Sequence, residues 1–433
     1  MLQFSEHEGF SKEVFVTHDL LKVEEGTLFS QTFKKTHLNQ EQLELCYEIN
    51  CIDQELGAYV IKTNYYIGID WVIPNKLPIQ ITPKIDNKAH QTDYLKMLLH
   101  CMKHPEVIHE IKELVEVKWD EPKIEIEQYQ DFLTPFLIIE FLGILKRIVR
   151  KGLKKSYYKV EHNLQSRIKG KVLVSKTIKH NLTRAKNTHT YCQFEEFGVN
   201  TPENRLLNKA FQLSKAYLPT FNKLTNAKGL NDLYNYINPA FSQVDTQVEL
   251  HEVPQRKSGS LFKEYDEALQ LARYIIQRYG YNIKTQTKNK VAIPPFWIDM
   301  SRLFEFYTLS LLKDQFGSQV KYHVTHKGNE LDYLLNAETL KMVIDAKYKL
   351  GYSTGSDNQD MRQVSGYARL KKVYDTLYGD KDYNKLIDCL IIYPDQQTGV
   401  AKLEASDLKH NPIPDYINIF KVGVRLPVLD DTV

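Results

Sequence analysis

Two carboxylates and a lysine fall within two neighbouring hydrophobic segments in the last third of the chain. Asp332 lies in the segment ELDYLL, and Asp345 and Lys347 lie in the segment VIDAKYK. Side chains two apart in a strand project to the same side, and an adjacent strand can bring Asp332 beside Asp345 and Lys347. Together with the backbone carbonyl of Ala346, the two carboxylates offer the hard oxygen ligands that Mg²⁺ prefers. This set suits phosphodiester hydrolysis, in which Mg²⁺ would activate water and Lys347 would hold that water or offset transition-state charge.

Four further polar residues flank this set. Glu305 precedes it in the sequence LFEFY, and we expect it to supply another catalytic carboxylate. Asp360, Gln363 and Tyr367 follow it, and we expect them to support the site or to touch a DNA backbone. Gln363 and Tyr367 are four residues apart, so in a helix they share one face.

Each residue also has a simpler interpretation. A D-x-K triplet on a strand is common and is usually solvated. Asp332 could be a turn or edge residue, and Glu305 could pair with Arg302 on the surface. Gln363 and Tyr367 at this spacing are more often packing residues. The combination in one order, on strands and helices, favours catalysis.

The surrounding pattern predicts the elements that must position these residues. The order α-β-β-β-α-β fits a mixed sheet flanked by helices and resembles the core of PD-(D/E)xK restriction-endonuclease-like proteins. We expect helices over Ile298–Phe316 and Asp357–Leu377, and strands over Val320–Thr325, Glu330–Leu335, Leu340–Tyr348 and Leu386–Tyr393.

The rest of the chain predicts an α+β protein of three domains. Residues 1–125 form a mixed α/β domain with several short strands over Ala58–Ile85, a short helix over Tyr94–Met102 and an extended segment over Val115–Ile126. Residues 126–290 form a basic, largely helical region, and residues 291–433 the nuclease-type domain. Helices of the middle region are expected over Gln130–Gly152, Pro202–Leu218 and Leu261–Tyr279. Thr201 before Pro202 is a good helix start, with a capping hydroxyl and proline at the first helical position.

The segment from Lys146 to Lys186 is a local positive surface in a chain whose net charge is only +3. It holds fourteen lysines and arginines, and Glu161 is its only carboxylate. Tyrosines lie among the cations, so contact with DNA phosphates is one prediction and docking of an acidic protein partner is the alternative. The residues that we expect to touch DNA are Lys151, Lys154, Lys155, Arg167, Lys169, Lys171 and Arg184.

Composition excludes several other classes of protein. Five scattered cysteines without a CxxC pair argue against a disulfide framework and against structural zinc, so we expect a cytoplasmic protein. The sequence predicts neither a signal peptide nor a membrane span. It also lacks the GxxxxGK[ST], HExxH and GxSxG motifs, so it predicts no nucleotide-hydrolysing site of its own.

The residues assembled above resemble the McrC family, the nuclease subunit of modification-dependent McrBC restriction systems. The resemblance extends from Gln130 to the C-terminus, whereas residues 1–120 match only in size and general character. Leu331 stands where the family often has proline before the first acid, which changes a turn and not a ligand. The matching stretches are RIVRKG at Arg147–Gly152, then Leu153 and Tyr157, RIKGK at Arg167–Lys171, Asn181-Leu182, FEEF at Phe194–Phe197, TPENRLL at Thr201–Leu207, Asp332, and Asp345-Ala346-Lys347.

The resemblance implies a function within a larger assembly. Such proteins work with an AAA+ GTPase partner, McrB, which recognises modified DNA and translocates. The McrC-like subunit stimulates that GTPase through its N-terminal part and cuts the DNA with Mg²⁺. Two other functions stay open: a non-catalytic adaptor that binds DNA and activates the GTPase, and a stand-alone repair nuclease of the PD-(D/E)xK superfamily.

Overall fold

The structure is a computed structural model that divides into two compact units. Unit 1 comprises Met1–Gln130, Lys223–Gly229 and Asn289–Val433, and unit 2 comprises Asp131–Asn222 and Leu230–Lys288. The expected division into three domains stays a prediction. The residues that the structure describes are 1–9, 14–37, 40–86, 91–101, 104, 114–118, 121–127, 133–216, 228–253, 263–282, 290–326, 329–353, 355, 357–379 and 383–428.

Two sheets form the N-terminal part of unit 1. One is antiparallel with the order β2-β5-β4-β3, and the other has the order β1-β7-β6-β14-β8, in which β1 and β7 are parallel. The short strands expected over Ala58–Ile85 are confirmed as β5, β6 and β7, and the short helix as α1 (Tyr94–Cys101), whereas the long pair β3 and β4 was not expected. The strands are β1 (Leu2–Ser5), β2 (Val14–Thr17), β3 (Leu28–His37), β4 (Gln40–Asp53), β5 (Ala58–Thr63), β6 (Tyr66–Ile73), β7 (Leu77–Thr82), β8 (Val115–Val117) and β14 (Phe296–Asp299).

Strand β14 joins this sheet from a distant part of the sequence, because it pairs with both β6 and β8. Trp297 is fully buried, and its Nε1 donates to Asp70 Oδ2 at 2.8 Å. Lys118 Nζ donates to the same oxygen at 2.7 Å. The chain then enters α9 (Met300–Phe316), which the Asp299 side chain caps by accepting from the Arg302 N–H at 3.0 Å. The helix that carries Glu305 therefore starts directly from the N-terminal sheet.

The C-terminal part of unit 1 is a five-stranded mixed sheet with the order β15-β16-β17-β18-β19. The first three strands are antiparallel to their neighbours, and β17, β18 and β19 are parallel. The structure confirms the predicted helix α9 and the four predicted strands, and adds β19. These elements are β15 (Val320–His326), β16 (Asn329–Asn336), β17 (Lys341–Ala346), β18 (Asp388–Pro394) and β19 (Ile419–Val424).

The single helix expected over Asp357–Leu377 is wrong in one respect, because the structure has two helices there. They are α10 (Asn358–Tyr367) and α11 (Lys371–Leu377). Leu370 adopts an extended conformation before α11 and packs against the core of the sheet. Burial of this side chain explains why the helical periodicity is interrupted.

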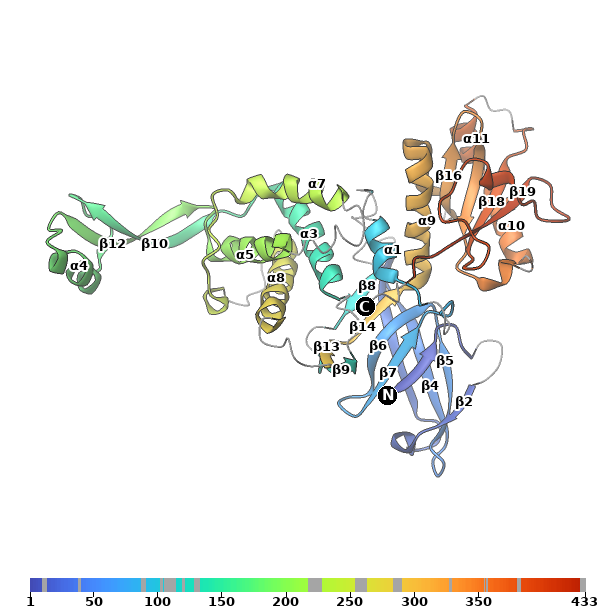
Figure 1. Cartoon of the computed structure of the whole chain (residues 1–433), viewed down its shortest axis with the longest axis horizontal. Helices are drawn as coiled ribbons and strands as arrows, with labels where there is room; N and C mark the ends of the chain where they lie inside the picture. Colours follow the sequence, from blue (N-terminus) through green and yellow to red (C-terminus); the bar gives the residue numbers. More distant parts are fainter. Residues whose placement is uncertain are drawn as a thin grey trace. The chain divides into compact units, whose positions relative to one another are not determined.

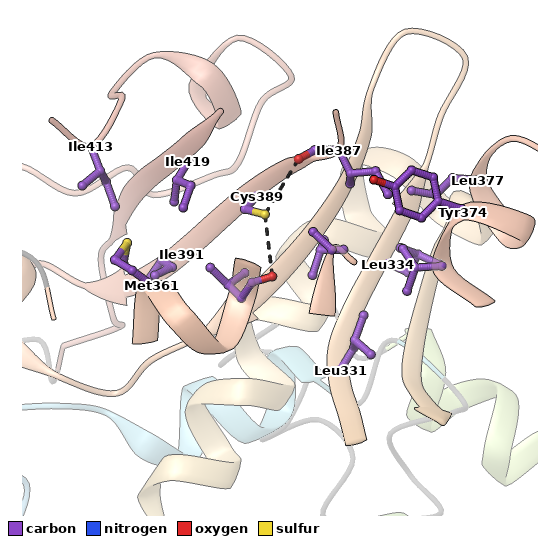
Figure 2. Packing of buried hydrophobic residues seen from close by; sticks show 14 of the residues in the cluster. Leu331, Leu334, Met361, Tyr374, Leu377, Ile387, Cys389, Ile391, Ile413 and Ile419 are labelled. Carbon is purple, nitrogen blue, oxygen red and sulfur yellow. Dashed lines mark hydrogen bonds between the residues drawn. The ribbon is translucent and has the colours of Figure 1, made fainter. Parts of the chain in front are cut away.

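Helices α10 and α11 cover one face of this sheet (Figure 2). Leu334 and Ile391 of the sheet pack there with Met361 of α10 and Tyr374 of α11. The opposite face carries Tyr333, whose hydroxyl donates to the Glu305 carbonyl of α9 at 2.6 Å. The sheet is therefore held between helices on both faces, and the chain as a whole is α+β with mixed sheets.

Unit 2 consists of helices and a long β-ribbon, with α4 near one end of the ribbon (Figure 1). The three expected helices are confirmed as α3, α5 and α8, although Gln130, Leu218 and Leu261 lie outside the described residues. Strands β10 and β12 pair along ten residues each, and β11 adds to β12. The elements are α3 (Leu133–Lys151), β10 (Ser156–Gln165), β11 (Lys171–Val172), α4 (Val174–His180), β12 (His189–Gly198), α5 (Pro202–Ala216), α7 (Lys228–Ile237) and α8 (Lys263–Asn282).

The TPENRLL stretch joins the ribbon to the helices of unit 2. The fully buried Asn204 donates to the Val199 carbonyl at 2.7 Å and to the Lys154 carbonyl at 2.9 Å. Its Oδ1 accepts from the Tyr265 hydroxyl at 3.0 Å, which ties in α8. A buried amide that makes three hydrogen bonds fixes local geometry, so this stretch is structural.

None of the helices that the structure describes has the length and apolar character needed to span a membrane.

Gly68 tests the joint between β6 and β14. A Cβ atom at this position would lie 2.0 Å from the Phe296 carbonyl oxygen, which is backbone and has no room to retreat. We expect Gly68→Ala to lower the free energy of unfolding of unit 1 by about 2–4 kcal/mol, measured by urea denaturation. Unchanged stability would contradict the pairing of these two strands.

Candidate active site

Asp332 and Asp345 meet where the ladder between β16 and β17 stops. The last backbone pair is Tyr333 with Ile344, so Asp332 and Asp345 are the next residues in register. Beyond that pair the backbone ladder ends, and the Asp332 side chain makes the next contact instead: its Oδ2 accepts from the Ala346 N–H at 2.8 Å. The carboxylate therefore sits against the backbone of the segment that carries Asp345 and Lys347.

Asp345 and Lys347 form a close ion pair at the end of β17. Lys347 Nζ lies 2.8 Å from Asp345 Oδ2, and the Asp345 side chain is only 2% exposed. This contact pairs a buried carboxylate with a cation. The Lys347 N–H donates to the Ile392 carbonyl of β18 at 2.8 Å, which fixes this backbone.

Helix α10 holds the lysine from the other side. Lys347 Nζ donates to Gln363 Oε1 at 2.9 Å, and Gln363 Nε2 donates to the Tyr367 hydroxyl at 2.7 Å. The spacing of four residues thus produces one polar chain that ends on Lys347. Packing alone does not explain Gln363, because its side chain is exposed.

Asp360 lies beside this chain but has other principal partners. Its Oδ2 accepts from Lys349 Nζ at 2.8 Å and from the Tyr352 hydroxyl at 2.5 Å. Lys347 Nζ is 4.0 Å from its Oδ1. Asp360 therefore fixes the loop after β17 against α10 and adds a negative charge near Lys347.

Glu305 is held by two aromatic residues of β15. Its Oε1 accepts from the Tyr322 hydroxyl at 2.9 Å and lies 2.8 Å from His323 Nε2. The simpler interpretation made Glu305 a surface partner of Arg302 or of a neighbouring lysine; the charge of Arg302 does act on Glu305, but the Glu305 side chain is only 17% exposed and is held by β15. Neither Tyr322 nor His323 was predicted, because aromatic residues on a strand are ordinary core residues in a sequence.

The electrostatics of these carboxylates differ from one another. Burial raises the pKa of Asp332 well above its usual value, and the charges of Glu305 and Asp345 raise it further. Burial also raises the pKa of Asp345, although Lys347 partly offsets this effect. Burial would raise the pKa of Glu305 too, but the hydrogen bond from His323 and the charge of Arg302 leave that pKa below its usual value.

The pKa of Lys347 completes the charge pattern. Burial lowers it, but the adjacent Asp345 carboxylate more than offsets burial, so the net pKa lies above the usual value for lysine. The site therefore holds a charged lysine beside two carboxylates that resist ionisation together.

This donor set fits a small hard cation. Asp332, Asp345 and the Ala346 carbonyl supply oxygen atoms only, which suits Mg²⁺. Asp345 is buried and Asp332 is half-buried, and the pKa values of both stay raised despite Lys347, so a cation would add positive charge that the site can accommodate. Among the described residues no three His, Cys, Asp or Glu side chains are grouped as an ion site, so the carbonyl would be needed.

The residues expected to contact DNA all belong to unit 2 and fall into two groups. Lys151 and Lys154 lie near acidic residues, with Lys151 Nζ 2.8 Å from Glu264 and Lys154 Nζ 3.8 Å from Glu203. Lys169 lies 4.0 Å from the Phe194 ring centroid. The second group is exposed and makes no ion pair with any residue that the structure describes: Lys155, Arg167, Lys171 and Arg184.

The raised pKa of Asp332 predicts how stability depends on pH. The folded state keeps this proton to a higher pH than the unfolded state, so stability falls as pH rises above about 4 toward the raised pKa. Asp332→Asn stays neutral and still offers an oxygen to the Ala346 N–H. In EDTA at pH 8 we expect this variant to exceed the native chain in unfolding free energy by about 1 kcal/mol or more, with a smaller gain at pH 5. A variant that is less stable at both pH values would contradict the account of this carboxylate.

Comparison with known proteins gives one family. The family model described as McrBC 5-methylcytosine restriction system component matches residues 61–394. No protein with a curated description matches the chain.

Two solved structures of Thermococcus gammatolerans are similar to parts of the chain. One is a refined half-complex from a tetradecameric assembly of McrB AAA+ hexamers with bound McrC, at 16% identity, 85% coverage of this chain, 78% coverage of that chain and a TM-score of 0.36. The other is a cryo-EM structure of the McrBC complex, at 18% identity, 59% coverage of this chain, 67% coverage of that chain and a TM-score of 0.25.

The family model spans most of the chain, including both strands of the candidate site, and confirms the resemblance found in the sequence. The chain therefore belongs to the McrBC family of 5-methylcytosine restriction system components.

Proposed function

We propose that this chain is the DNA-cutting subunit of a modification-dependent restriction system, with a PD-(D/E)xK nuclease core. One observation carries the proposal: Asp332, Asp345 and Lys347 converge where the β16–β17 ladder stops, on a mixed sheet between helices. Membership of a restriction family supports DNA as the substrate.

Asp332, Asp345 and the Ala346 carbonyl would hold Mg²⁺. When bound there, the ion would lower the pKa of a water molecule and polarise a phosphate oxygen. The carboxylates contribute the negative charge that the ion requires, and burial excludes competing water from them.

Lys347 is the residue that we assign to the reacting phosphate. Asp345 and Gln363 hold its ammonium group from two sides, so little reorganisation is needed when negative charge develops. Tyr367 fixes the amide of Gln363, and Asp360 fixes the adjacent loop through Lys349. The charge of Glu305 raises the pKa of Asp332 further, and a bound cation would offset that charge.

The partner that we propose is an AAA+ GTPase of McrB type. The support is the family, whose restriction systems are described for 5-methylcytosine, and the absence of a phosphate-binding GxxxxGK[ST] motif from this sequence. We further propose that the N-terminal part of this chain stimulates the GTPase and that the partner selects the methylated DNA.

Asp345→Asn tests the nuclease proposal. Loss of this charge removes a proposed metal ligand and a partner of Lys347, so we expect cleavage of methylated DNA with partner, GTP and Mg²⁺ to fall at least about 100-fold. Asp388→Asn is the matched control, because Asp388 lies at the other end of the same sheet and pairs with Asn418 and Lys409. We expect the control to cut within about threefold of the native chain.

The outcomes separate the competing functions. Undiminished cleavage by Asp345→Asn would contradict the assigned site. Stimulated GTPase and DNA binding without any strand scission by the native chain would identify an adaptor. Cleavage by the native chain without partner or GTP would identify a stand-alone nuclease.

We also propose that the exposed cations of the β10–β12 ribbon and its neighbouring loops, Lys155, Arg167, Lys171 and Arg184, contact DNA phosphates. These cations form no ion pair with a described residue, and the exposed rings of Tyr157 and Phe197, whose centroids are 5.2 Å apart, also support this role. Apolar side chains exposed near α4 support the alternative, a protein partner. They are Ile168, Val174, Ile178 and Leu182.

A pair of double variants tests the ribbon. Lys155→Gln with Lys171→Gln is expected to weaken DNA binding and to reduce the slope of log K against log salt by roughly 1–2. Lys215→Gln with Lys402→Gln removes the same charge from exposed sites elsewhere and is expected to change neither. Unchanged DNA binding by the ribbon variant, with loss of partner binding, would assign the ribbon to the partner.

A further inference from the structure

The backbone that follows Lys347 is held by the N-terminal sheet. Lys84 Nζ donates to the Tyr348 carbonyl at 2.8 Å, and the Tyr348 hydroxyl donates to Glu6 Oε1 at 2.7 Å. Lys84 Nζ also lies 4.1 Å from the centroid of the Tyr348 ring. Lys84 therefore contacts the carbonyl and the ring of Tyr348, and Glu6 contacts its hydroxyl.

Glu6 and Lys84 reach this point because of the strand order. Strands β1 and β7 are parallel neighbours, and each of the two residues lies just past the carboxyl end of its strand. The Glu6 N–H donates to the Thr82 carbonyl at 2.9 Å, and the Lys84 N–H donates to Glu6 Oε1 at 3.1 Å. The pair is thus built into the edge of the sheet.

The arrangement is costly for a contact that serves only packing. Glu6 is 1% exposed, and its second oxygen has no hydrogen-bond partner among the described residues. Burial raises the pKa of Glu6 to about 7 and lowers the pKa of Lys84 to about 8. Apolar side chains of similar size would commonly dock two elements at lower cost.

The consequence of the contact falls on Lys347. The Lys347 N–H is fixed by the Ile392 carbonyl, and the carbonyl of the next residue, Tyr348, is fixed by Lys84. Lys349 is then held by Asp357 and Asp360 at 2.8 Å each. Among the contacts described above, the bond from Lys84 is the only one to the backbone between Lys347 and Lys349 that comes from outside the C-terminal sheet and α10.

We propose that Glu6, Lys84 and Tyr348 are positioning residues that set Lys347 for catalysis and couple the nuclease site to the N-terminal sheet. This inference rests on the proposed nuclease function. It makes the N-terminal sheet part of the active conformation, so that a displacement at the ends of β1 and β7 is transmitted to the lysine.

The double variant Glu6→Gln with Lys84→Met tests the inference. Glutamine still accepts from the Tyr348 hydroxyl, and methionine fills the space of the lysine stem, so no buried charge is left unpaired. The donor to the Tyr348 carbonyl is lost, together with the contacts of the ammonium group with the Tyr348 and Tyr65 rings. Asp70→Asn with Lys118→Met is the matched control, because it neutralises a similar buried pair in the same sheet that has no contact with residues 345–349.

Two measurements are made on the full-length variants. In hydrogen exchange on the chain alone, we expect protection of peptides over residues 345–349 to fall about tenfold or more. In single-turnover cleavage with partner, GTP and saturating Mg²⁺, we expect the rate to fall about tenfold, with the half-saturating Mg²⁺ concentration within about twofold. The control should change neither measurement.

Unchanged protection of residues 345–349, or unchanged cleavage, would overturn the inference. Equal losses in the control would also overturn it, because they would reflect general loosening of the sheet. If the native chain fails to cut DNA at all, the proposed function fails, and hydrogen exchange still decides whether Lys84 holds this backbone.

Discussion

The candidate site depends on one hydrogen bond, from the Ala346 N–H to the Asp332 carboxylate. In an ordinary antiparallel pair the next strand residue would continue the backbone ladder. Here the Asp332 side chain, within β16, takes over where β17 ends, so an acidic group lies against the segment that carries Asp345 and Lys347. The two strands thereby bring the two carboxylates together, and Lys347 follows directly after β17.

This placement is unfavourable for the apoprotein. Burial raises the pKa values of both carboxylates; the charges of Glu305 and Asp345 add to the rise at Asp332, and the charge of Asp360 adds to it at Asp345. Lys347 offsets part of the charge, while Gln363 and Tyr367 fix the lysine. Buried like charges that persist despite their cost are typical of functional sites, where stability is exchanged for reactivity.

Local patterns predicted most of the C-terminal sheet and its polar residues. Period-two alternation put Asp345 and Lys347 on one side, and spacing by four put Gln363 and Tyr367 on one helix face; the structure joins both pairs through Lys347. The pattern did not foresee Tyr322 and His323 beside Glu305, because aromatic strand residues carry no sign of their partner.

Long-range features were beyond the reach of local patterns. Strand β14 enters a sheet whose other strands lie far earlier in the chain, and nothing in FWID specifies that partner. The contacts of Glu6 and Lys84 with Tyr348 join residues separated by some 260 to 340 positions. The β10–β12 ribbon was missed for another reason: each of its two long strands buries one side chain, Leu164 in β10 and Cys192 in β12, so it lacks the apolar alternation that marks a half-buried strand.

The central claim is that Asp332 and Asp345 hold a divalent cation, and calorimetric titration tests it most directly. Mg²⁺ would be titrated into the metal-free native chain and into Asp345→Asn at pH 8. The account predicts saturable binding to the native chain and at least about tenfold weaker binding to the variant. Equal binding by both chains, or none by the native chain, would contradict it.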